Sequence, residues 1–188
     1  LQHKGKFVIA KNPQSIAIRT HAYDLGFGTG KTNSQNLMGA VCDYILVFRK
    51  EGQKDKPVKA IHDLISNPLG WITANDWVKW AGVWTDIKEG EVLDGYRNAK
   101  GDDTEKHICP LQLEVIRRCI LLYSNPQDVV LDPFMGIGST AYVAVKNNRK
   151  AIGFELKESY YQQSLANLQK AENELKPVDD LFSCLEGV

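Results

Sequence analysis

Long apolar runs, paired cysteines and an excess of charge of either sign are all missing from this sequence. No hydrophobic stretch approaches the roughly 18 consecutive apolar residues that a membrane-spanning helix needs, and residues 1–4 do not begin a secretory signal. The 4 cysteines are scattered without CxxC spacing, which argues against a zinc site and against a disulfide framework. We therefore expect a cytoplasmic protein that binds no metal and keeps its cysteines as buried thiols.

The sequence also lacks a methionine at position 1, where Leu1 stands. We therefore expect the chain to be part of a longer protein. With 188 residues, of which 43% are hydrophobic, it is long enough for one packed core and a small additional lobe.

The net charge of zero hides a gradient along the chain. Residues 1–58 hold nine Lys and Arg against four Asp and Glu, whereas residues 171–188 hold one Lys against five acids. Such a separation suits a protein that meets phosphates at one end, but solvated charged faces produce it as well. The gradient alone therefore does not decide whether the partner is a nucleic acid.

Two short β-rich runs stand out in the first third. Lys6–Ala10 is apolar and β-branched and stops at the turn signal Asn12-Pro13, and Asp43–Lys50 has the same character. We predict that both runs are strands. The polar, glycine-containing stretch from Gly26 to Asn36 predicts a loop between them.

All four tryptophans follow in the next segment. Trp77, Trp80 and Trp84 are spaced three and four residues apart, so they would share one face of a helix that begins near Asn75 if that helix continues past Gly82. Aromatic residues at helical spacing usually pack into a core, so we favour burial over base stacking. The polar stretch 90–104 is expected to be a loop.

The last third has the clearest pattern. Pro110 to Tyr123 carries apolar residues at helical spacing behind a proline suited to the first helical position. The pattern then predicts a strand, a glycine turn, a helix, a second strand and a second helix, which is a βαβα unit with a parallel sheet and a right-handed crossover. These elements are Asp128–Leu131, the turn, Ser139–Asn147, Lys150–Phe154 and Lys157–Lys176.

The glycine turn at 132–140, Asp-Pro-Phe-Met-Gly-Ile-Gly-Ser-Thr, is the strongest candidate for a ligand site. Glycines let a ligand approach the backbone closely, and the start of the following helix offers unpaired N–H groups. Glu155, at the end of the next strand, stands where a carboxylate accepts the ribose hydroxyls of a nucleoside.

Two nucleoside ligands compete for this turn. Gly136-x-Gly138-x-x-Ala141 formally matches the dinucleotide fingerprint, which would make the chain a fragment of an NAD-binding oxidoreductase. Asp132 at the strand end favours S-adenosylmethionine (SAM) instead, because a carboxylate suits the positively charged methionine part of that molecule. A glycine turn that binds nothing is the third alternative.

Several blocks resemble the motifs of a known family. Residues 132–140 resemble a SAM-binding motif I, and Ala-Ile-Gly-Phe-Glu at 151–155, followed by Tyr160 and Tyr161, resembles motif II. Residues 105–116, Glu-Lys-His-Ile-Cys-Pro-Leu-Gln-Leu-Glu-Val-Ile, are similar to motif X and stand directly before motif I. Phe-Val-Ile-Ala-Lys-Asn-Pro at 7–13 is similar to motif VIII. Together these blocks resemble the β-class DNA amino-methyltransferases of phage and prophage type, which methylate adenine N6 or cytosine N4.

The resemblance implies an α/β, Rossmann-like fold of SAM-dependent methyltransferases, present in part, with a small recognition lobe. It implies four regions: a motif VIII strand pair and basic loop at 1–50, a target-recognition region at 51–104, a SAM-binding βαβα unit at 105–176 and an acidic tail at 177–188. It also assigns the residues of the SAM pocket, which are Lys106, His107, Cys109, Pro110, Asp132, Pro133, Phe134, Gly136, Gly138, Ser139, Thr140 and Glu155.

DNA is the partner that the resemblance implies. The basic first third and its 26–36 loop would contact the phosphates, and Lys31, Arg49 and Lys50 are the residues we assign to these contacts. A module that binds SAM or DNA without catalysing a reaction is the remaining alternative.

The family transfers its methyl group at a [DNS]-P-P-[YFW] motif, and the sequence contains none. Asn12-Pro13 and Asn125-Pro126 lack the second proline and the aromatic residue, so we expect both to be turns and assign no catalytic residue. In this class the motif precedes motif VIII. The strands that belong with this motif are therefore missing too, and their absence leaves sheet edges open. We expect an upstream segment, a second chain or a swapped copy to cover these edges.

Overall fold

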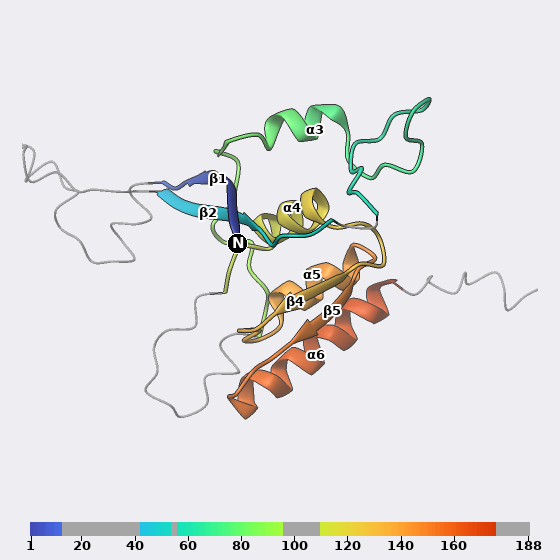
Figure 1. The fold of residues 1–188 in the computed structure, drawn as a ribbon. Helices are drawn as coiled ribbons and strands as arrows, with labels where there is room; N and C mark the ends of the chain where they lie inside the picture. Colours follow the sequence, from blue (N-terminus) through green and yellow to red (C-terminus); the bar gives the residue numbers. More distant parts are fainter. Residues whose placement is uncertain (13–41, 54–55, 96–109, 176–188) are drawn as a thin grey trace, which may run out of the picture. The chain divides into compact units, whose positions relative to one another are not determined.

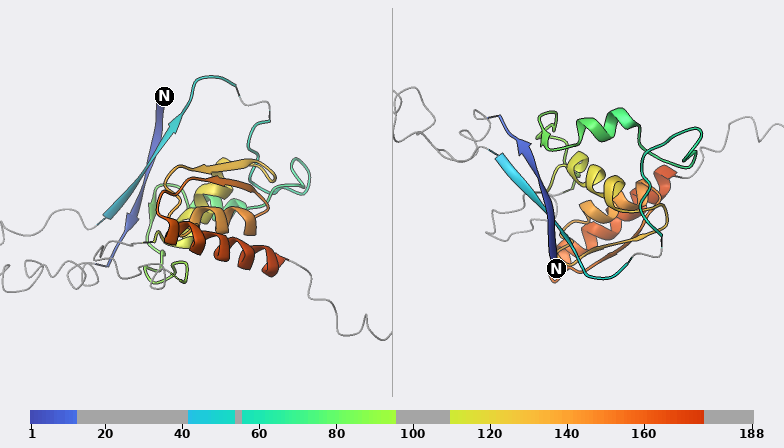
Figure 2. Two further views of the ribbon diagram at one scale, coloured as in Figure 1. Left: turned by 90° about the horizontal axis from the view of Figure 1, so that it is seen from below. Right: turned by 45° about the horizontal axis from the view of Figure 1, so that its top comes forward.

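The computed structural model describes residues 1–12, 42–53, 56–95 and 110–175. The chain forms two compact units, which are described separately (Figures 1 and 2). The first unit comprises Leu1–Pro57 and Ile61–Glu89, and the second comprises Val58–Ala60 and Gly90–Val188.

A three-stranded sheet organises the first unit. Strands β1 (Gln2–Ala10) and β2 (Cys42–Arg49) pair antiparallel, with a register shift between His3 and Gly5. This finding confirms the two strands that the sequence predicts, although β1 begins earlier than expected. A third, unpredicted strand, β3 (Val83–Trp84), pairs parallel to β1 and gives the order β2-β1-β3.

The two faces of this sheet differ in burial. On one face Ile9 is buried and the Phe7 ring lies 5.1 Å from the Trp84 ring, which is fully buried. The apolar residues of β2 on the opposite face remain about half exposed, because no described element of the unit covers them. These residues are Tyr44, Leu46 and Phe48.

The expected tryptophan helix is shorter than the spacing predicts. Helix α3 (Ala74–Lys79) is stabilised by a capping box in which the Thr73 hydroxyl and the Asp76 carboxylate bind each other's backbone N–H groups. It ends before Gly82, whose φ of 99° is incompatible with a right-handed helix. The helix therefore does not continue past Gly82, and the condition under which the three tryptophans would share one helical face is not met.

Two of the four tryptophans are buried in the way that core packing requires, and Trp71 is partly buried. Trp80 follows α3 and Trp84 lies in β3, and both are buried, with the Trp84 Nε1–H donating to the Trp80 carbonyl at 2.9 Å. Trp77 is half exposed.

The second unit contains the predicted βαβα arrangement behind a helix. In chain order it comprises α4 (Leu113–Tyr123), β4 (Val129–Asp132), α5 (Ser139–Lys146), β5 (Lys150–Gly153) and α6 (Glu158–Leu175). The parallel pairing of β4 and β5 around α5 is confirmed. The expectation that Pro110 occupies the first helical position is wrong, because α4 begins at Leu113 behind the N-cap residue Gln112.

The core of this unit lies between its helices. Helix α5 packs against α4, α6 and both strands, and Ile116, Tyr142, Ala144 and Ala171 are buried at these contacts. Leu93, from the segment that precedes α4, is 3% exposed and joins the same cluster. The connector 90–95 therefore contributes to the packing of this unit, and the Leu113 N–H also donates to the Glu91 carbonyl.

The β4–β5 pair buries only one of its faces. Val130 and Ala151 face the helical core, whereas Val129, Leu131 and Ile152 on the other face are 51–60% exposed. Within the described ranges, the outer edges of β4 and β5 form no further strand pairing. We call Val129, Leu131 and Ile152 the open face of the β4–β5 pair.

The cysteines of the described segments are not paired. Cys42 and Cys119 are free, and burial raises the pKa of the Cys119 thiol to about 11, so this thiol stays protonated at neutral pH and is a poor nucleophile. The described residues contain no cluster of His, Cys, Asp and Glu that could hold a metal ion. No helix among them has the length and apolar character needed to cross a membrane.

Candidate cofactor pocket

The loop between β4 and α5 depends on two glycines in left-handed conformation. Gly138 is the N-cap of α5 with φ 87°, and a Cβ there would lie 3.0 Å from the Ser164 Cβ. Gly136 has φ 55°, but no heavy atom would lie within 4 Å of its Cβ. Substitution of Gly138 would therefore strain the backbone and crowd α6, whereas the space beside Gly136 is open to a ligand.

Hydrogen bonds fix the shape of this loop. The Phe134 N–H donates to Asp132 Oδ1 at 3.0 Å, and the Met135 N–H donates to the Phe154 carbonyl at 2.9 Å. The Gly136 N–H donates to Glu155 Oε2 at 2.8 Å, while Glu155 Oε1 accepts the Lys157 N–H at 2.8 Å. The Glu155 carboxylate thus ties the glycine loop to the start of α6.

Helix α6 supports the loop from behind. Asn167 is 5% exposed, and its Nδ2 donates to the Ile137 carbonyl at 2.8 Å. Ser164, which is fully buried, lies where it would meet a Cβ on Gly138. These contacts give the loop a defined conformation before any ligand binds, which reduces the conformational entropy lost on binding.

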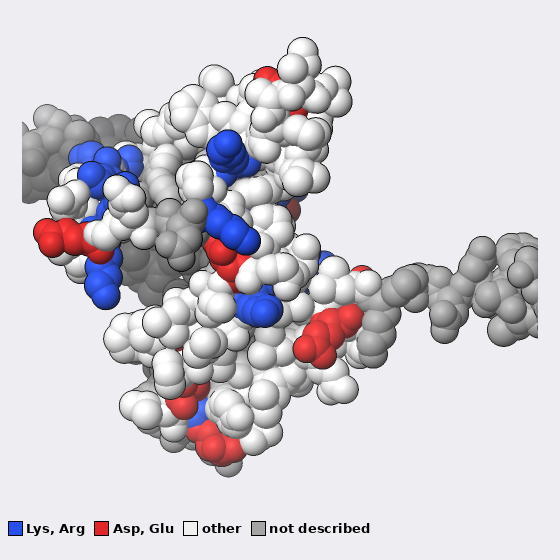
Figure 3. Space-filling view, turned by 45° about the vertical axis from the view of Figure 1, so that its right-hand side comes forward, with Lys and Arg blue, Asp and Glu red and all other residues white. Residues whose placement is uncertain are grey.

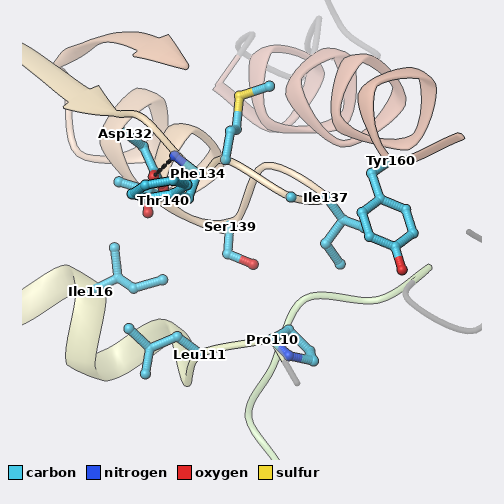
Figure 4. Close-up of a pocket in the computed structure, with 11 residues that line it drawn as sticks. Pro110, Leu111, Ile116, Asp132, Phe134, Ile137, Ser139, Thr140 and Tyr160 are labelled. Atoms are coloured by element: carbon cyan, nitrogen blue, oxygen red, sulfur yellow. Dashed lines mark hydrogen bonds between the residues drawn. The ribbon is translucent and has the colours of Figure 1, made fainter. Parts of the chain in front are cut away.

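A cavity of about 350 Å³ opens at the carboxyl end of β4 (Figure 4). Polar groups from the end of β4 and the start of α5 stand beside apolar side chains from the loop, α4 and α6, and Figure 4 shows Ser139 between the Asp132–Thr140 side and Tyr160. The lining residues are Pro110, Leu111, Ile116, Asp132, Phe134, Met135, Gly136, Ile137, Ser139, Thr140 and Tyr160.

The structure brings together much of the predicted pocket. The predicted residues that line the cavity are Pro110, Asp132, Phe134, Gly136, Ser139 and Thr140. Pro133, Gly138 and Glu155 do not line it, and the last two instead fix the loop that does. Lys106, His107 and Cys109 lie outside the described residues.

Among the described residues that line the cavity, Asp132 is the one with an acidic side chain. Its Oδ1 is oriented by the Phe134 N–H, and its Oδ2 accepts no hydrogen bond from the described part of the chain. A carboxylate oxygen at the mouth of the cavity is therefore available to a cationic group of a ligand.

The sequence did not assign five apolar and aromatic residues to the pocket. Ile116 stood out as a member of the apolar stripe of α4 and as the last residue of the block similar to motif X, and Tyr160 as part of a motif resemblance. A lining role follows from the meeting of α4, the loop and α6 in space, which no local pattern encodes. The unassigned lining residues are Leu111, Ile116, Met135, Ile137 and Tyr160.

The residues predicted to contact DNA lie in the first unit. Arg49 ends β2 and Lys50 follows it, both exposed, and Arg49 Nη2 donates to the Gly52 carbonyl at 3.2 Å. Lys11 forms an ion pair with Asp43, and Lys31 lies outside the described residues. Figure 3 shows both basic and acidic side chains on the surface of the described residues.

The fold matches that of solved methyltransferase structures. The structure of the putative DNA modification methylase TTHA0409 from Thermus thermophilus, complexed with S-adenosyl-L-methionine, superposes with a TM-score of 0.60 at 21% identity, over 90% of this chain and 54% of that chain. This likeness confirms the expected α/β methyltransferase fold.

Sequence comparisons identify the family. A family model described as DNA methylase, for N6 and N4 methyltransferases, matches residues 8–166. The chain therefore belongs to the N6/N4 DNA methylase family, as its motifs predict.

Two curated relatives illustrate the similarity. DNA adenine methyltransferase YhdJ of Escherichia coli (strain K12) is 39% identical over 131 residues, which is 70% of this chain and 40% of YhdJ. Type II methyltransferase M.MthZI of Methanothermobacter thermautotrophicus is 32% identical over 119 residues, 63% of this chain and 32% of M.MthZI. The chain thus spans well under half the length of these relatives.

Proposed function

We propose that this chain supplies the SAM-binding and DNA-binding parts of a methyltransferase that modifies the exocyclic amine of adenine or cytosine in DNA. The observation that supports it most directly is the cavity at the carboxyl end of β4, where Asp132, Gly136 and the first turn of α5 meet. In open α/β sheets, ligands bind at the carboxyl ends of the strands. Family membership supports the same reaction class and gives no support to an NAD-binding oxidoreductase.

The pocket fits SAM in size and in chemistry. Its volume of about 350 Å³ lies in the range of small-molecule sites. Asp132 would hold the cationic methionine part, the backbone N–H groups at the start of α5 would face the carboxylate, and apolar walls such as Ile116 would accept the adenosine. Glu155 already accepts two N–H groups, but a carboxylate has about four acceptor positions, so it would also be able to accept ribose hydroxyls.

SAM, when bound, supplies an activated methyl group that the amine nitrogen attacks directly. The residues of this chain would act by position and charge, without a covalent enzyme intermediate. The rigid loop at 133–138, fixed by Glu155 and Asn167, would hold the methyl donor in one orientation.

The open face of the β4–β5 pair supports a further part of the proposal. Its three apolar side chains, and the strand edges that no described residue pairs with, would be covered by a polypeptide that carries the [DNS]-P-P-[YFW] motif. An upstream segment, a second chain and a swapped copy would each serve. A DNA substrate would place the assembled enzyme in the cytoplasm.

Replacement of Asp132 or Glu155 by alanine should weaken SAM binding about 10- to 150-fold, because loss of a charged hydrogen bond costs roughly 1.5–3 kcal/mol. Isothermal titration calorimetry of SAM with the wild type, Asp132→Ala and Glu155→Ala measures this effect. Glu158→Ala is the matched control, because it removes an acid from the first turn of α6 outside the pocket lining. Wild-type affinity in both variants, or tight binding of NAD by the wild type, would contradict the assignment.

Replacement of Lys31, Arg49 and Lys50 by alanine should weaken DNA binding and reduce its dependence on salt. Each lost phosphate contact lowers the slope of log K against log salt by about one, so the triple variant should lose about three. Fluorescence anisotropy with a labelled duplex at several salt concentrations gives the slope. A control variant in which three exposed acids are replaced should not lower the slope. An unchanged slope in the triple variant would show that this surface does not contact the DNA phosphates.

A further inference from the structure

A closed loop at residues 61–72 projects from the first unit. At its base Ile61 and Ile72 form a parallel bridge, and the His62 N–H donates to the Ile72 carbonyl at 2.7 Å. Further along, Asp63 and Asn67 exchange two backbone hydrogen bonds of 2.9 and 3.0 Å. The chain therefore forms a narrow hairpin-like projection.

Three large aliphatic side chains of this loop point into solvent. Leu64 is 83% exposed, Ile65 95% and Leu69 85%, and we call these three residues the apolar tip. Single exposed aliphatic residues are common on protein surfaces. The packing of this unit does not explain why two adjacent aliphatic residues, Leu64 and Ile65, are exposed at the end of a projecting loop.

The hydrogen bonds of the loop prevent the apolar tip from folding inward. Asp63 Oδ1 accepts the N–H groups of Ile65 at 2.8 Å and Ser66 at 3.2 Å, and Asn67 Nδ2 donates to the Ile61 carbonyl at 2.6 Å. The Ile65 N–H bond is the main cause that lowers the pKa of Asp63, so the carboxylate stays ionised. At Gly70 a Cβ would lie 2.4 Å from the His62 backbone, so the chain closes tightly there.

The charges that precede the loop in the sequence suit a polyanion. Lys56 and Lys59 precede it along the chain and are exposed, and between residues 56 and 73 Asp63 is the one acid. The Asp63 carboxylate is directed at the backbone of its own loop. An apolar tip that follows two lysines matches a DNA groove, in which apolar bases lie between phosphates.

We propose that the apolar tip inserts into the DNA duplex as a wedge between bases, a role that rests on the proposed function. Leu and Ile are among the side chains that open base steps in this way, and a base that must leave the stack for methylation leaves a gap that such a wedge fills. A protein partner would instead need a broad surface, about 800 Å² on each side in a standard interface, which a narrow loop does not offer.

The test compares the wild type with a Leu64→Ser, Ile65→Ser double variant on two duplexes. One duplex is intact, and the other has a central abasic site that offers a ready-made gap. Both have mixed flanking sequence, and binding is measured by fluorescence anisotropy. The wild type should bind the abasic duplex on the order of tenfold more tightly, and the double variant should lose this preference.

Matched controls separate the wedge from loss of structure. Val78→Ser removes an aliphatic side chain that is 65% exposed on α3 of the same unit, and it should keep the preference for the abasic duplex. Thermal unfolding and SAM calorimetry should match the wild type in all variants, because the apolar tip makes no buried contact and does not line the pocket.

Each outcome bears on the wedge. A wild type that binds DNA without preferring the abasic duplex, or a double variant that keeps the preference, overturns the wedge and leaves the proposed function intact. If the double variant loses the same affinity for both duplexes, the wedge is also overturned. The same holds if the double variant loses only its binding to a complementing polypeptide. A wild type that binds no DNA overturns the proposed DNA contact together with the wedge.

Discussion

The 188-residue chain alone should transfer no methyl group to DNA above background, even if it binds SAM as proposed above. Positioning of the reactants lowers the activation barrier of a catalysed reaction by about 7–11 kcal/mol. A protein that holds the methyl donor but not the amine loses most of this lowering. On this basis the rate should fall by at least about five orders of magnitude relative to the complete enzyme. Transfer of a radiolabelled methyl group from SAM to unmodified bacterial DNA measures it.

The two Asn-Pro pairs do not offer a substitute for the missing motif. The Asn125 N–H donates to Asp128 Oδ2 at 2.8 Å and Gln127 has φ 68°, so this pair forms the turn that the sequence predicts. The Asn12 N–H donates to Glu89 Oε1 at 3.2 Å, and Pro13 lies outside the described residues.

The assay becomes informative when a polypeptide with the [DNS]-P-P-[YFW] motif is added. Turnover only in its presence would identify the chain as the SAM-binding part of a divided enzyme. The control is the same polypeptide with the aromatic residue of its motif replaced by alanine. Turnover by the chain alone would show that its catalytic residues lie elsewhere than the family motif predicts.

Replacement of Trp84 by alanine should lower the free energy of unfolding of the first unit by about 3–5 kcal/mol, as large-to-small substitutions of buried aromatic residues do. The side chain is fully buried, packs on Phe7 and donates a hydrogen bond to the Trp80 carbonyl. Its removal leaves a cavity beside Phe7 and breaks the hydrogen bond to the Trp80 carbonyl. Hydrogen exchange of the β1 amides in increasing urea measures the loss.

Trp77→Ala is the matched control for this substitution. The Trp77 side chain is 48% exposed, so the same chemical change should cost well under half as much. Equal destabilisation by the two variants would contradict the packing described for the first unit.

The parts of the fold that the sequence predicts best are those with local rules. The glycine turn before α5 needs positive φ at Gly136 and Gly138, which few other residues adopt, so its place is readable from the chain. The strands β4 and β5 and the helix between them carry clear apolar patterns. Their parallel pairing follows from the connection through α5, and the structure confirms it.

The features that were missed depend on contacts between distant residues. The spacing of the tryptophans is compatible with a helix, yet Trp84 belongs to a strand. The reason is that Val83 and Trp84 pair with Val8 and Ile9, which lie at the other end of the unit's sequence. Pro110 has the chemistry of a first helical residue, but it lines the cavity instead. The bond between the Gly136 N–H and Glu155 joins two motifs that were interpreted separately.

The open face of the β4–β5 pair has a practical consequence for anyone who produces this chain. Within the described residues the outer edges of β4 and β5 are unpaired, and such edges beside exposed Val, Leu and Ile side chains add readily to one another as the concentration rises. Overexpression in isolation therefore favours inclusion bodies. Synthesis in the same cell as a polypeptide of the kind proposed above would give the open face a surface to pack against before the chains associate with one another.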